Sequence, residues 1–373
     1  MKCPCCNSNE INNFLETYVL KSCAWYSKKL RVTDFKHTPN YCFNCGHIFN
    51  SSAPTEAEMK NFYLDQFLHT HEAYNIENRI KIIESLFKNN GKIRFLDFGG
   101  NSKLSFHKLL EKKGYILKII DVENSFKKEK FDIISAYSVL PHLINLNKIM
   151  KIFDKILAEN GKIIIEVPNS NFYKDDYSGL IYESQHHFQP SSLSHLFSRY
   201  GFRELYYSKD NSSRDFQFVS VYEKSKTKQK LRVPNKDAIE CYKLGRQKQI
   251  LEKNFPELFF KSFNKSNLIV LWGVNRYLFK ILESNVLNDY KIITLDINSK
   301  KNFLLDEYNF DFYTPSEFFQ NYKMILAKYN VNISQTEFVI TAVAYYASIK
   351  KEINLISKKV HIYDPLKKVK DKL

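Results

Sequence analysis

Two pairs of cysteines near the start of the chain have the spacing of a metal site. Cys3 and Cys6 form the first pair, Cys42 and Cys45 the second, and together they can supply four thiolates to a tetrahedral Zn²⁺. Six of the seven cysteines lie before residue 46, and the opening residues do not read as a secretion signal, so we expect metal binding rather than disulfides. Because four cysteine ligands leave no open coordination position, this zinc would stabilise the fold. Two pairs of buried free thiols are the alternative.

A second set of reactive side chains lies in the segment Glu183-Ser-Gln-His186-His187. A histidine whose pKa is near its usual value of about 6.5 can remove a proton from an acceptor at neutral pH. His186 or His187 is therefore the predicted base, with Glu183 as its orienting partner, and at least one of the two histidines is expected to be structural. His142 is a weaker candidate, because its position is more typical of a residue that borders a cofactor or caps a helix.

The stretch Arg94 to Asn101, Arg-Phe-Leu-Asp-Phe-Gly-Gly-Asn, is the element around which the chain is organised. Its apolar half predicts a buried parallel strand. Two glycines come next, and glycine is needed where a ligand presses against the backbone. The amphipathic run from Leu104 to Lys112 predicts a helix. Strand, tight turn and helix in this order are typical of the first crossover of a doubly wound sheet.

Further apolar segments predict the rest of this sheet. A second strand, Tyr115 to Asp121, ends in an acid, and a third covers Phe131 to Ser135. The segment Leu157 to Pro168 predicts a helix end, a turn and a fourth strand. The interval between Asp121 and Phe131 is too short for the helix and strand that a normal doubly wound sheet would place there, so one crossover is trimmed.

The composition limits the partners. The formal net charge is +16, but no basic helix or RNA-binding motif stands out, so we expect a lysine-rich solvated surface and no nucleic-acid partner. A basic cleft for an anionic substrate such as a nucleotide-sugar also fits this charge. No run of about 18 apolar residues predicts a membrane span, and we expect a cytoplasmic protein.

The middle of the chain resembles the class I S-adenosylmethionine-dependent methyltransferases. The matching residues are Phe95-Leu-Asp-Phe-Gly-Gly100, Asp121, the segment Phe131 to His142, Leu157-Ala-Glu-Asn-Gly161 and Pro168-Asn169. The whole architecture resembles the zinc-containing sugar C-methyltransferases, and Trp272-Gly273 and Asp296-Ile-Asn298 match their last domain.

This resemblance implies an α/β fold with an N-terminal zinc-binding module, a central Rossmann-like class I methyltransferase domain and a C-terminal Rossmann-like α/β domain. The implied boundaries are 1–52 for the zinc module, 53–92 for a helical bridge, 93–222 for the methyltransferase domain, 223–262 for a linker and helix, 263–366 for the C-terminal domain and 367–373 for a basic tail.

The resemblance also implies the cofactor site. S-adenosylmethionine would lie against the glycine turn, Asp121 would accept hydrogen bonds from its ribose, and residues after the third strand would border it from the other side. The implied cofactor residues are Asp97, Gly99, Gly100, Asn101, Asp121, Ser138, Val139 and His142. The acceptor would be a nucleotide-linked sugar, bound between the central and C-terminal domains.

The catalytic segment differs from that of the resembled family. The sugar C-methyltransferases carry Tyr-His-Glu-His where this chain has Ile181-Tyr-Glu-Ser184, so only Glu183 matches. Lys103 also stands where the family usually has glycine. Methylation of oxygen in a similar acceptor therefore stays open, as does a non-catalytic role as a binding protein.

Overall fold

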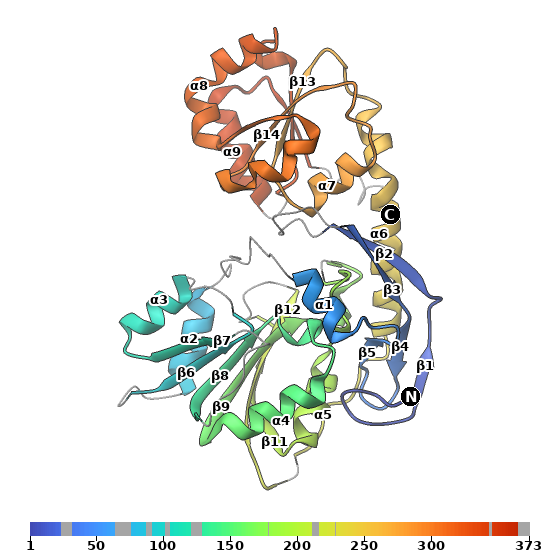
Figure 1. The fold of residues 1–373 in the computed structure, drawn as a ribbon, viewed down its shortest axis with the longest axis vertical. Helices are drawn as coiled ribbons and strands as arrows, with labels where there is room; N and C mark the ends of the chain where they lie inside the picture. Colours follow the sequence, from blue (N-terminus) through green and yellow to red (C-terminus); the bar gives the residue numbers. More distant parts are fainter. Residues whose placement is uncertain are drawn as a thin grey trace. The chain divides into compact units, whose positions relative to one another are not determined.

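The computed structural model describes residues 1–23, 32–63, 76–86, 92–100, 105–120, 129–177, 179–210, 216–227, 229–342 and 345–364. The chain divides into two compact units (Figure 1). The first comprises Met1–Ser22 and Thr33–Arg246, and the second comprises Cys23–Val32 and Gln247–Leu373. The predicted zinc module, helical bridge and central domain thus share one unit, apart from residues 23–32.

A six-stranded sheet forms the centre of the first unit. Its strand order is β11-β12-β9-β8-β6-β7, in which β7, β6, β8 and β9 are parallel and β12 is antiparallel to both of its neighbours. The strands are β6 (Arg94–Phe98), β7 (Ile116–Ile120), β8 (Phe131–Tyr137), β9 (Leu157–Pro168), β11 (Phe202–Ser208) and β12 (Gln217–Lys224). The four parallel strands confirm the predicted doubly wound sheet.

One detail of this sheet differs from the prediction. The sequence predicted a helix end and a turn over residues 157–161, but α4 (Leu146–Ile156) ends just before them and β9 begins at Leu157. The pairing with β8 moves from Phe131 opposite Leu157 to Ile133 opposite Lys162, so the intervening residues form a bulge in the strand. Asn160 and Gly161, which are typical turn residues, lie in this bulge.

Helices cover both faces of the sheet. On one face α2 (Ile76–Leu86) and α3 (Ser105–Lys112) bury Ile83 and Phe106 against Phe95 and Ile133. On the other face α4 and α5 (Pro190–Arg199) pack against the opposite side of the same strands. The loops at the carboxyl ends of the parallel strands include two short 3₁₀ turns, η1 (Leu140–His142) and η2 (Ser170–Phe172).

The N-terminal segment forms its own small sheets. The four-stranded antiparallel sheet has the order β1-β4-β5-β10, and β2 and β3 form a separate pair. The elements are β1 (Ile11–Asn13), β2 (Tyr18–Cys23), β3 (Val32–His37), β4 (Pro39–Cys42), β5 (Ile48–Asn50) and β10 (His186–His187), with α1 (Glu56–Tyr63) next in sequence after β5. The last strand of the N-terminal sheet thus comes from the segment of the predicted base.

The second unit contains a five-stranded, wholly parallel sheet in the order β15-β14-β13-β16-β17. This arrangement fits the α/β domain predicted over residues 263–366. Its elements are β13 (Leu268–Trp272), α7 (Arg276–Glu283), β14 (Lys291–Leu295), η3 (Ser299–Tyr308), β15 (Asp311–Tyr313), α8 (Pro315–Lys328), η4 (Ile333–Gln335), β16 (Thr336–Ile340), α9 (Tyr346–Ile356) and β17 (His361–Tyr363). Helix α6 (Ala238–Phe260) precedes them in sequence and lies within the segment 223–262 that was predicted to hold a linker and a helix.

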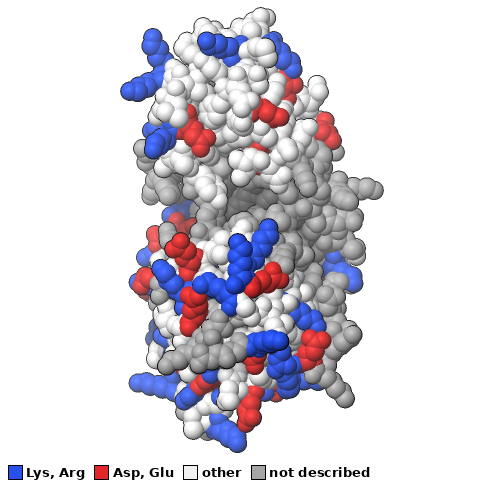
Figure 2. Space-filling view, turned by 90° about the vertical axis from the view of Figure 1, so that its left-hand side faces the viewer, with Lys and Arg blue, Asp and Glu red and all other residues white. Residues whose placement is uncertain are grey.

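Charged side chains are interspersed on the face shown in Figure 2, with lysines and arginines beside aspartates and glutamates. This distribution is typical of a solvated surface rather than of a continuous basic patch. Across the described residues, no helix combines the length and the apolar character that a membrane span requires.

Candidate functional site

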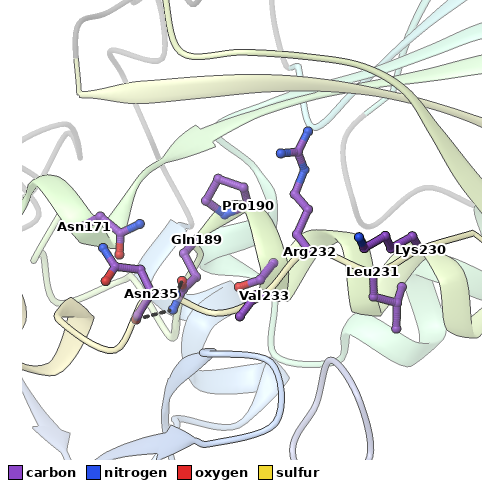
Figure 3. Close-up of a pocket in the computed structure, with 9 residues that line it drawn as sticks. Asn171, Gln189, Pro190, Lys230, Leu231, Arg232, Val233 and Asn235 are labelled. Atoms are coloured by element: carbon purple, nitrogen blue, oxygen red, sulfur yellow. Dashed lines mark hydrogen bonds between the residues drawn. The ribbon is translucent and has the colours of Figure 1, made fainter.

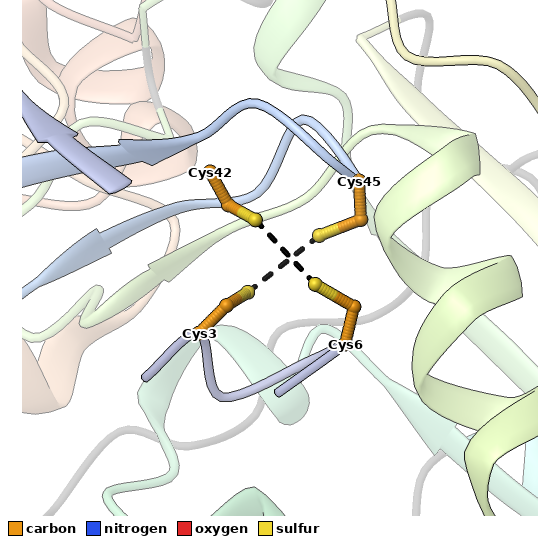
Figure 4. A group of neighbouring side chains, drawn as sticks. All are labelled: Cys3, Cys6, Cys42 and Cys45. Atoms are coloured by element: carbon orange, nitrogen blue, oxygen red, sulfur yellow. Dashed lines mark hydrogen bonds between the residues drawn. The ribbon is translucent and has the colours of Figure 1, made fainter. Parts of the chain in front are cut away.

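The four predicted zinc ligands lie together (Figure 4). The Sγ atoms of Cys3, Cys6, Cys42 and Cys45 all lie within 4.8 Å of one another. Two of the separations are 3.6 Å, for Cys3 and Cys45, and 3.4 Å, for Cys6 and Cys42. Thiolates that bind one Zn²⁺ at about 2.3 Å in a tetrahedron lie about 3.8 Å apart. The four side chains therefore fit a zinc ion in spacing and in chemistry, and zinc binding itself stays a prediction.

The backbone around the second cysteine pair depends on Gly46. Its φ is +73°, and its N–H donates to the carbonyl of Cys42 at 2.8 Å, which closes the turn between the two ligands. A Cβ at this position would lie 2.0 Å from Nε2 of Gln189. Only glycine allows both the left-handed conformation and this close approach.

Helix α5 and its N-cap bind both cysteine turns through their backbone carbonyls. Gln189 Nε2 donates to the carbonyl of Gly46 at 2.7 Å, and Ser191 Oγ donates to that of Cys45 at 2.8 Å. At the other end of the helix, Arg199 donates at 2.9 Å to the carbonyls of Pro4 and Cys5. The candidate metal centre is thus fixed to the domain that comes after it in sequence.

The predicted bases His186 and His187 form strand β10, opposite Phe49 and Ile48 of β5. Both imidazoles are buried and both have protein partners. His186 Nδ1 lies 3.0 Å from Nε2 of His47, and His187 Nδ1 lies 2.9 Å from the hydroxyl of Tyr173. The structure therefore brings the two histidines together with the N-terminal sheet.

Burial governs the ionisation of these histidines. It lowers the pKa of His186 to about 4, although a hydrogen bond with the backbone of Leu143 opposes the shift. Burial, with the nearby imidazoles of His37 and His186, holds the pKa of His187 well below its usual value. Both rings are therefore neutral at pH 7. The same burial disfavours their protonated forms, so neither ring has the pKa near 6.5 on which the predicted base role rests.

Two other predicted residues of the acceptor side meet at the carboxyl edge of the sheet. His142 ends η1 and is half-buried, and its Nδ1 lies 3.3 Å from the backbone carbonyl of Glu183. A carbonyl oxygen can only accept, so Nδ1 carries the proton and Nε2 holds the lone pair of the neutral ring. The structure thus joins Glu183 to His142.

The predicted glycine turn comes after β6 at the same edge. Gly99 has a φ of +85°, and its N–H donates to the carbonyl of Ile120 at 2.8 Å. A Cβ at Gly99 would lie 2.4 Å from Cγ2 of Val139, and one at Gly100 would lie 2.8 Å from Oδ2 of Asp97. The turn therefore requires glycine at both positions, and Gly99 and Val139 lie together as predicted. The predicted cofactor residues Asn101 and Asp121 lie outside the described part of the chain, as does Lys103.

Asp97 lies beneath this turn and binds protein groups. Its Oδ2 is 2.9 Å from Nε2 of His107 on α3, and its Oδ1 accepts from Ser135 Oγ at 2.7 Å. Sequence reasoning missed His107 and Ser135. The available signal was the position of His107 beside Phe106 on the apolar face of a short helix, where a polar side chain needs a buried partner.

A second missed group surrounds Ser138. This residue has a φ of +59°, its N–H donates to the carbonyl of Glu166 at 2.7 Å, and its Oγ accepts from Gln217 Nε2 at 2.7 Å. The side chain of Glu166 pairs with Arg79 of α2, with 2.5 Å between Oε1 and Nη2. The other charged residues of α2 are exposed, so the sequence does not indicate that Arg79 has a buried partner.

A pocket of about 400 Å³ lies beside the N-terminus of α5 (Figure 3). Its lining includes Asn171, Gln189, Lys230 and Arg232, and none of the predicted catalytic or cofactor residues. The guanidinium of Arg232 binds Glu204 at 2.7 Å. The pocket is therefore separate from the glycine turn and carries no assignment.

Comparison with known proteins finds a family model that matches part of the chain. Residues 69–206 match a family model described as a methyltransferase domain, and this match identifies the chain as a methyltransferase enzyme. No curated protein matches the chain. Among solved structures, the chain is similar to an S-adenosylmethionine-dependent methyltransferase from Mesorhizobium loti, with 12% identity over 39% of this chain and 97% of that chain and a TM-score of 0.28. It is also similar to one from Clostridium acetobutylicum, with 14% identity over 45% and 98% of the two chains and a TM-score of 0.29. Such low values support no argument about substrate or mechanism.

We predict that freshly purified, reduced protein contains about one zinc per chain. Cys42→Ser should lose the metal and lower the melting temperature, because the free energy of metal binding is part of the free energy of folding. Elemental analysis and thermal unfolding measure both effects. Cys241→Ser, which changes a buried thiol outside the cluster, is the control and should keep the zinc. Wild-type protein without zinc would contradict the assignment and leave four free thiols.

The buried histidines predict a loss of stability in acid. His186 has a folded pKa of about 4 and an unfolded pKa of about 6.5, so between these values the unfolded chain binds a proton that the folded chain excludes. The stability should be constant above about pH 6.5 and fall below it, by up to about 1.4 kcal/mol per pH unit for each such histidine. Thermal unfolding across this range should show a shallower slope for His186→Gln than for wild type. His361→Gln changes an exposed histidine and is the control, so its slope should equal that of wild type. A slope for His186→Gln equal to that of wild type would contradict the burial argument.

Proposed function

We propose that this enzyme transfers a methyl group from S-adenosylmethionine to a nucleotide-linked sugar or a related glycan precursor. The cofactor assignment rests on the match of residues 69–206 to a methyltransferase domain and on the place of the glycine turn at the carboxyl edge, where ligands of doubly wound sheets bind. The sugar acceptor rests on the resemblance of the whole architecture to the zinc-containing sugar C-methyltransferases.

The residues of the turn fit the cofactor by shape and by hydrogen-bonding capacity. Gly99 and Gly100 are partly buried and lie where a Cβ would collide with Val139, Asp97 and Ile119, and Asn101 comes directly after them. Ser138, Val139 and His142 would border the cofactor from the neighbouring strand, with Asp97 beneath the turn and Asp121 as acceptor for the ribose hydroxyls. When bound, S-adenosylmethionine supplies an electrophilic methyl group on its sulfonium.

Catalysis then depends on how the chain orients the acceptor and removes its proton. Methyl transfer is an in-line displacement, so holding the acceptor in a near-attack geometry contributes most of the rate. The base must be a neutral imidazole within hydrogen-bond reach of the acceptor. His186 and His187 are neutral but lie in strand β10, whereas His142 is half-buried and presents Nε2 as its acceptor nitrogen. His142 therefore joins them as a candidate of equal rank.

The catalytic segment leaves two alternatives. Methylation of carbon requires a group that stabilises an enolate, and the buried Ser184 stands where the resembled family has a histidine. Methylation of oxygen in the same kind of acceptor needs only the base. A non-catalytic binding role would instead require that the site no longer holds the cofactor.

We predict that S-adenosylmethionine or its demethylated product S-adenosylhomocysteine raises the melting temperature by mass action. Asp121→Ala should weaken this response, because the ribose hydroxyls lose their acceptor. Asp132→Ala, at the amino end of β8, is the matched control and should respond as wild type does. Failure of wild type to bind at millimolar cofactor would reject the cofactor site and favour the binding protein.

We also predict that one of His142→Ala, His186→Ala and His187→Ala lowers methyl transfer by about 10²–10⁴-fold. Affinity for S-adenosylhomocysteine should be retained in His186→Ala and His187→Ala, whereas any effect of His142→Ala should include weaker cofactor binding, because His142 would border the cofactor. The assay would measure transfer of labelled methyl from S-adenosylmethionine to a panel of nucleotide-sugars. Loss of turnover in none of the three variants would reject a histidine base.

The same acceptor, once found, distinguishes the two kinds of methylation. An enzyme that enolises its sugar should exchange the proton beside the ketone for deuterium in heavy water. Methylation without such exchange would reject transfer to carbon and leave transfer to oxygen.

A further inference from the structure

A row of polar side chains crosses the face of the central sheet that α2 and α3 cover, close to the carboxyl edge of the sheet. Asp97 of β6 is the register partner of Ser135 of β8, and Tyr137 of β8 is the register partner of Glu166 of β9. Because Ser135 and Tyr137 are two residues apart, their side chains point to the same face. The four side chains therefore form neighbouring pairs on three adjacent strands.

The two helices on this face each supply one partner to the row. His107 of α3 lies 2.9 Å from the carboxylate of Asp97. Arg79 of α2 pairs with Glu166, and its guanidinium carbon lies 3.7 Å from the centroid of the Tyr137 ring. Arg79 thus contacts the ends of two strands at once, by charge on β9 and by stacking on β8.

Ser138, the residue after Tyr137, has the unusual backbone of this edge. Its left-handed φ of +59° is unfavourable for any residue other than glycine. Its N–H donates to the backbone carbonyl of Glu166, so the conformation depends on where the end of β9 lies. Val139 comes next and packs against Gly99 at the closest approach of the two turns. A displacement of Glu166 or Tyr137 would therefore be passed directly to the cofactor turn.

We propose that Arg79 is a positioning residue for the methyl donor. By pairing with Glu166 and stacking on Tyr137, it fixes the Ser138–Val139 turn against the glycine turn without touching the reacting atoms. The inference rests on the proposed cofactor site. It assigns a role to α2, an element before the glycine motif that sequence reasoning treated as a bridge.

The test must separate position from stability. Arg79→Met alone would leave the buried Glu166 carboxylate without its partner and is expected to unfold the domain. The double variant Arg79→Met/Glu166→Met removes both charges and replaces them with apolar side chains, which often preserves stability. The matched control is Arg94→Met/Asp132→Met, a half-exposed pair with 3.6 Å between Arg94 Nε and Asp132 Oδ2, at the amino ends of β6 and β8.

The measurements are the melting temperature without ligand and the dissociation constant of S-adenosylhomocysteine by calorimetry. The Arg79/Glu166 double variant should melt near wild type but bind roughly tenfold to a hundredfold more weakly, because the Ser138–Val139 turn is no longer held against the glycine turn; each tenfold corresponds to about 1.4 kcal/mol. Arg79→Lys keeps the charge beside Glu166 but loses the planar stacking. Its affinity for S-adenosylhomocysteine should therefore lie between those of wild type and the Arg79/Glu166 double variant. The control pair should bind as wild type does.

Each other outcome decides against the proposal in a recognisable way. Wild-type affinity in the Arg79/Glu166 double variant would overturn the positioning role and leave the cofactor site intact. An affinity that falls only in step with the melting temperature, in this variant and in the control alike, would also overturn it. Absence of binding by wild-type protein would reject the cofactor site and the role of Arg79 together.

Discussion

The pairing of β10 with β5 is the contact on which the organisation of the first unit depends. It joins residues that lie 139 positions apart in sequence, and it places the buried His47 and His186 side by side. Helix α5 begins three residues after β10 and binds both cysteine turns through their carbonyls. The segment with the predicted base is therefore tied to the N-terminal sheet by β10 and to the cysteine turns by the helix that follows it. The N-terminal residues belong to the active domain and are no separate appendage.

The buried charge in this unit fixes geometry more than it adds stability. The attraction within a pair such as Arg79 and Glu166 roughly offsets the cost of removing both groups from water, whereas loss of one partner costs about 3–5 kcal/mol. Such a pair therefore contributes little net free energy but strongly disfavours any arrangement that separates its members. The Arg79–Glu166 pair lies beside Ser138, whose left-handed backbone persists only where the surrounding contacts hold it.

Local patterns in the sequence predicted the elements that carry them. The strands at β6, β7 and β8 and the grouping of four cysteines are evident from apolar runs and from short spacings. The partners of these elements across the sequence were not predictable. The pairing of β10 with β5 involves only two residues, and the contacts of Arg79 and His107 depend on which helix face is buried. Periodicity gives that face, but it does not give the strand residue opposite.

The two α/β units show why a glycine stands after the first strand. In both units its N–H donates to the last residue of the next strand, from Gly99 to Ile120 and from Gly273 to Leu295. In both, a Cβ would collide with the second residue beyond the other neighbouring strand, Val139 in one and Ala342 in the other. Glycine at this position is therefore a requirement of the crossover itself, where two loops pass closely.

The two units differ in the residue directly after this first glycine. In the second unit that residue is Val274, and its N–H donates at 2.8 Å to the carboxylate of Asp296, which also accepts from the backbone of Asn298. The acid at the end of the second strand is thus bound to the loops themselves. In the first unit Gly100 takes this place, with no side chain above the carboxylate of Asp97. A Cβ at Gly100 would lie 2.8 Å from Oδ2 of Asp97 and from Cγ2 of Ile119, so the second glycine allows close packing in this turn. The second unit, with Val274 in this place, does not share that constraint.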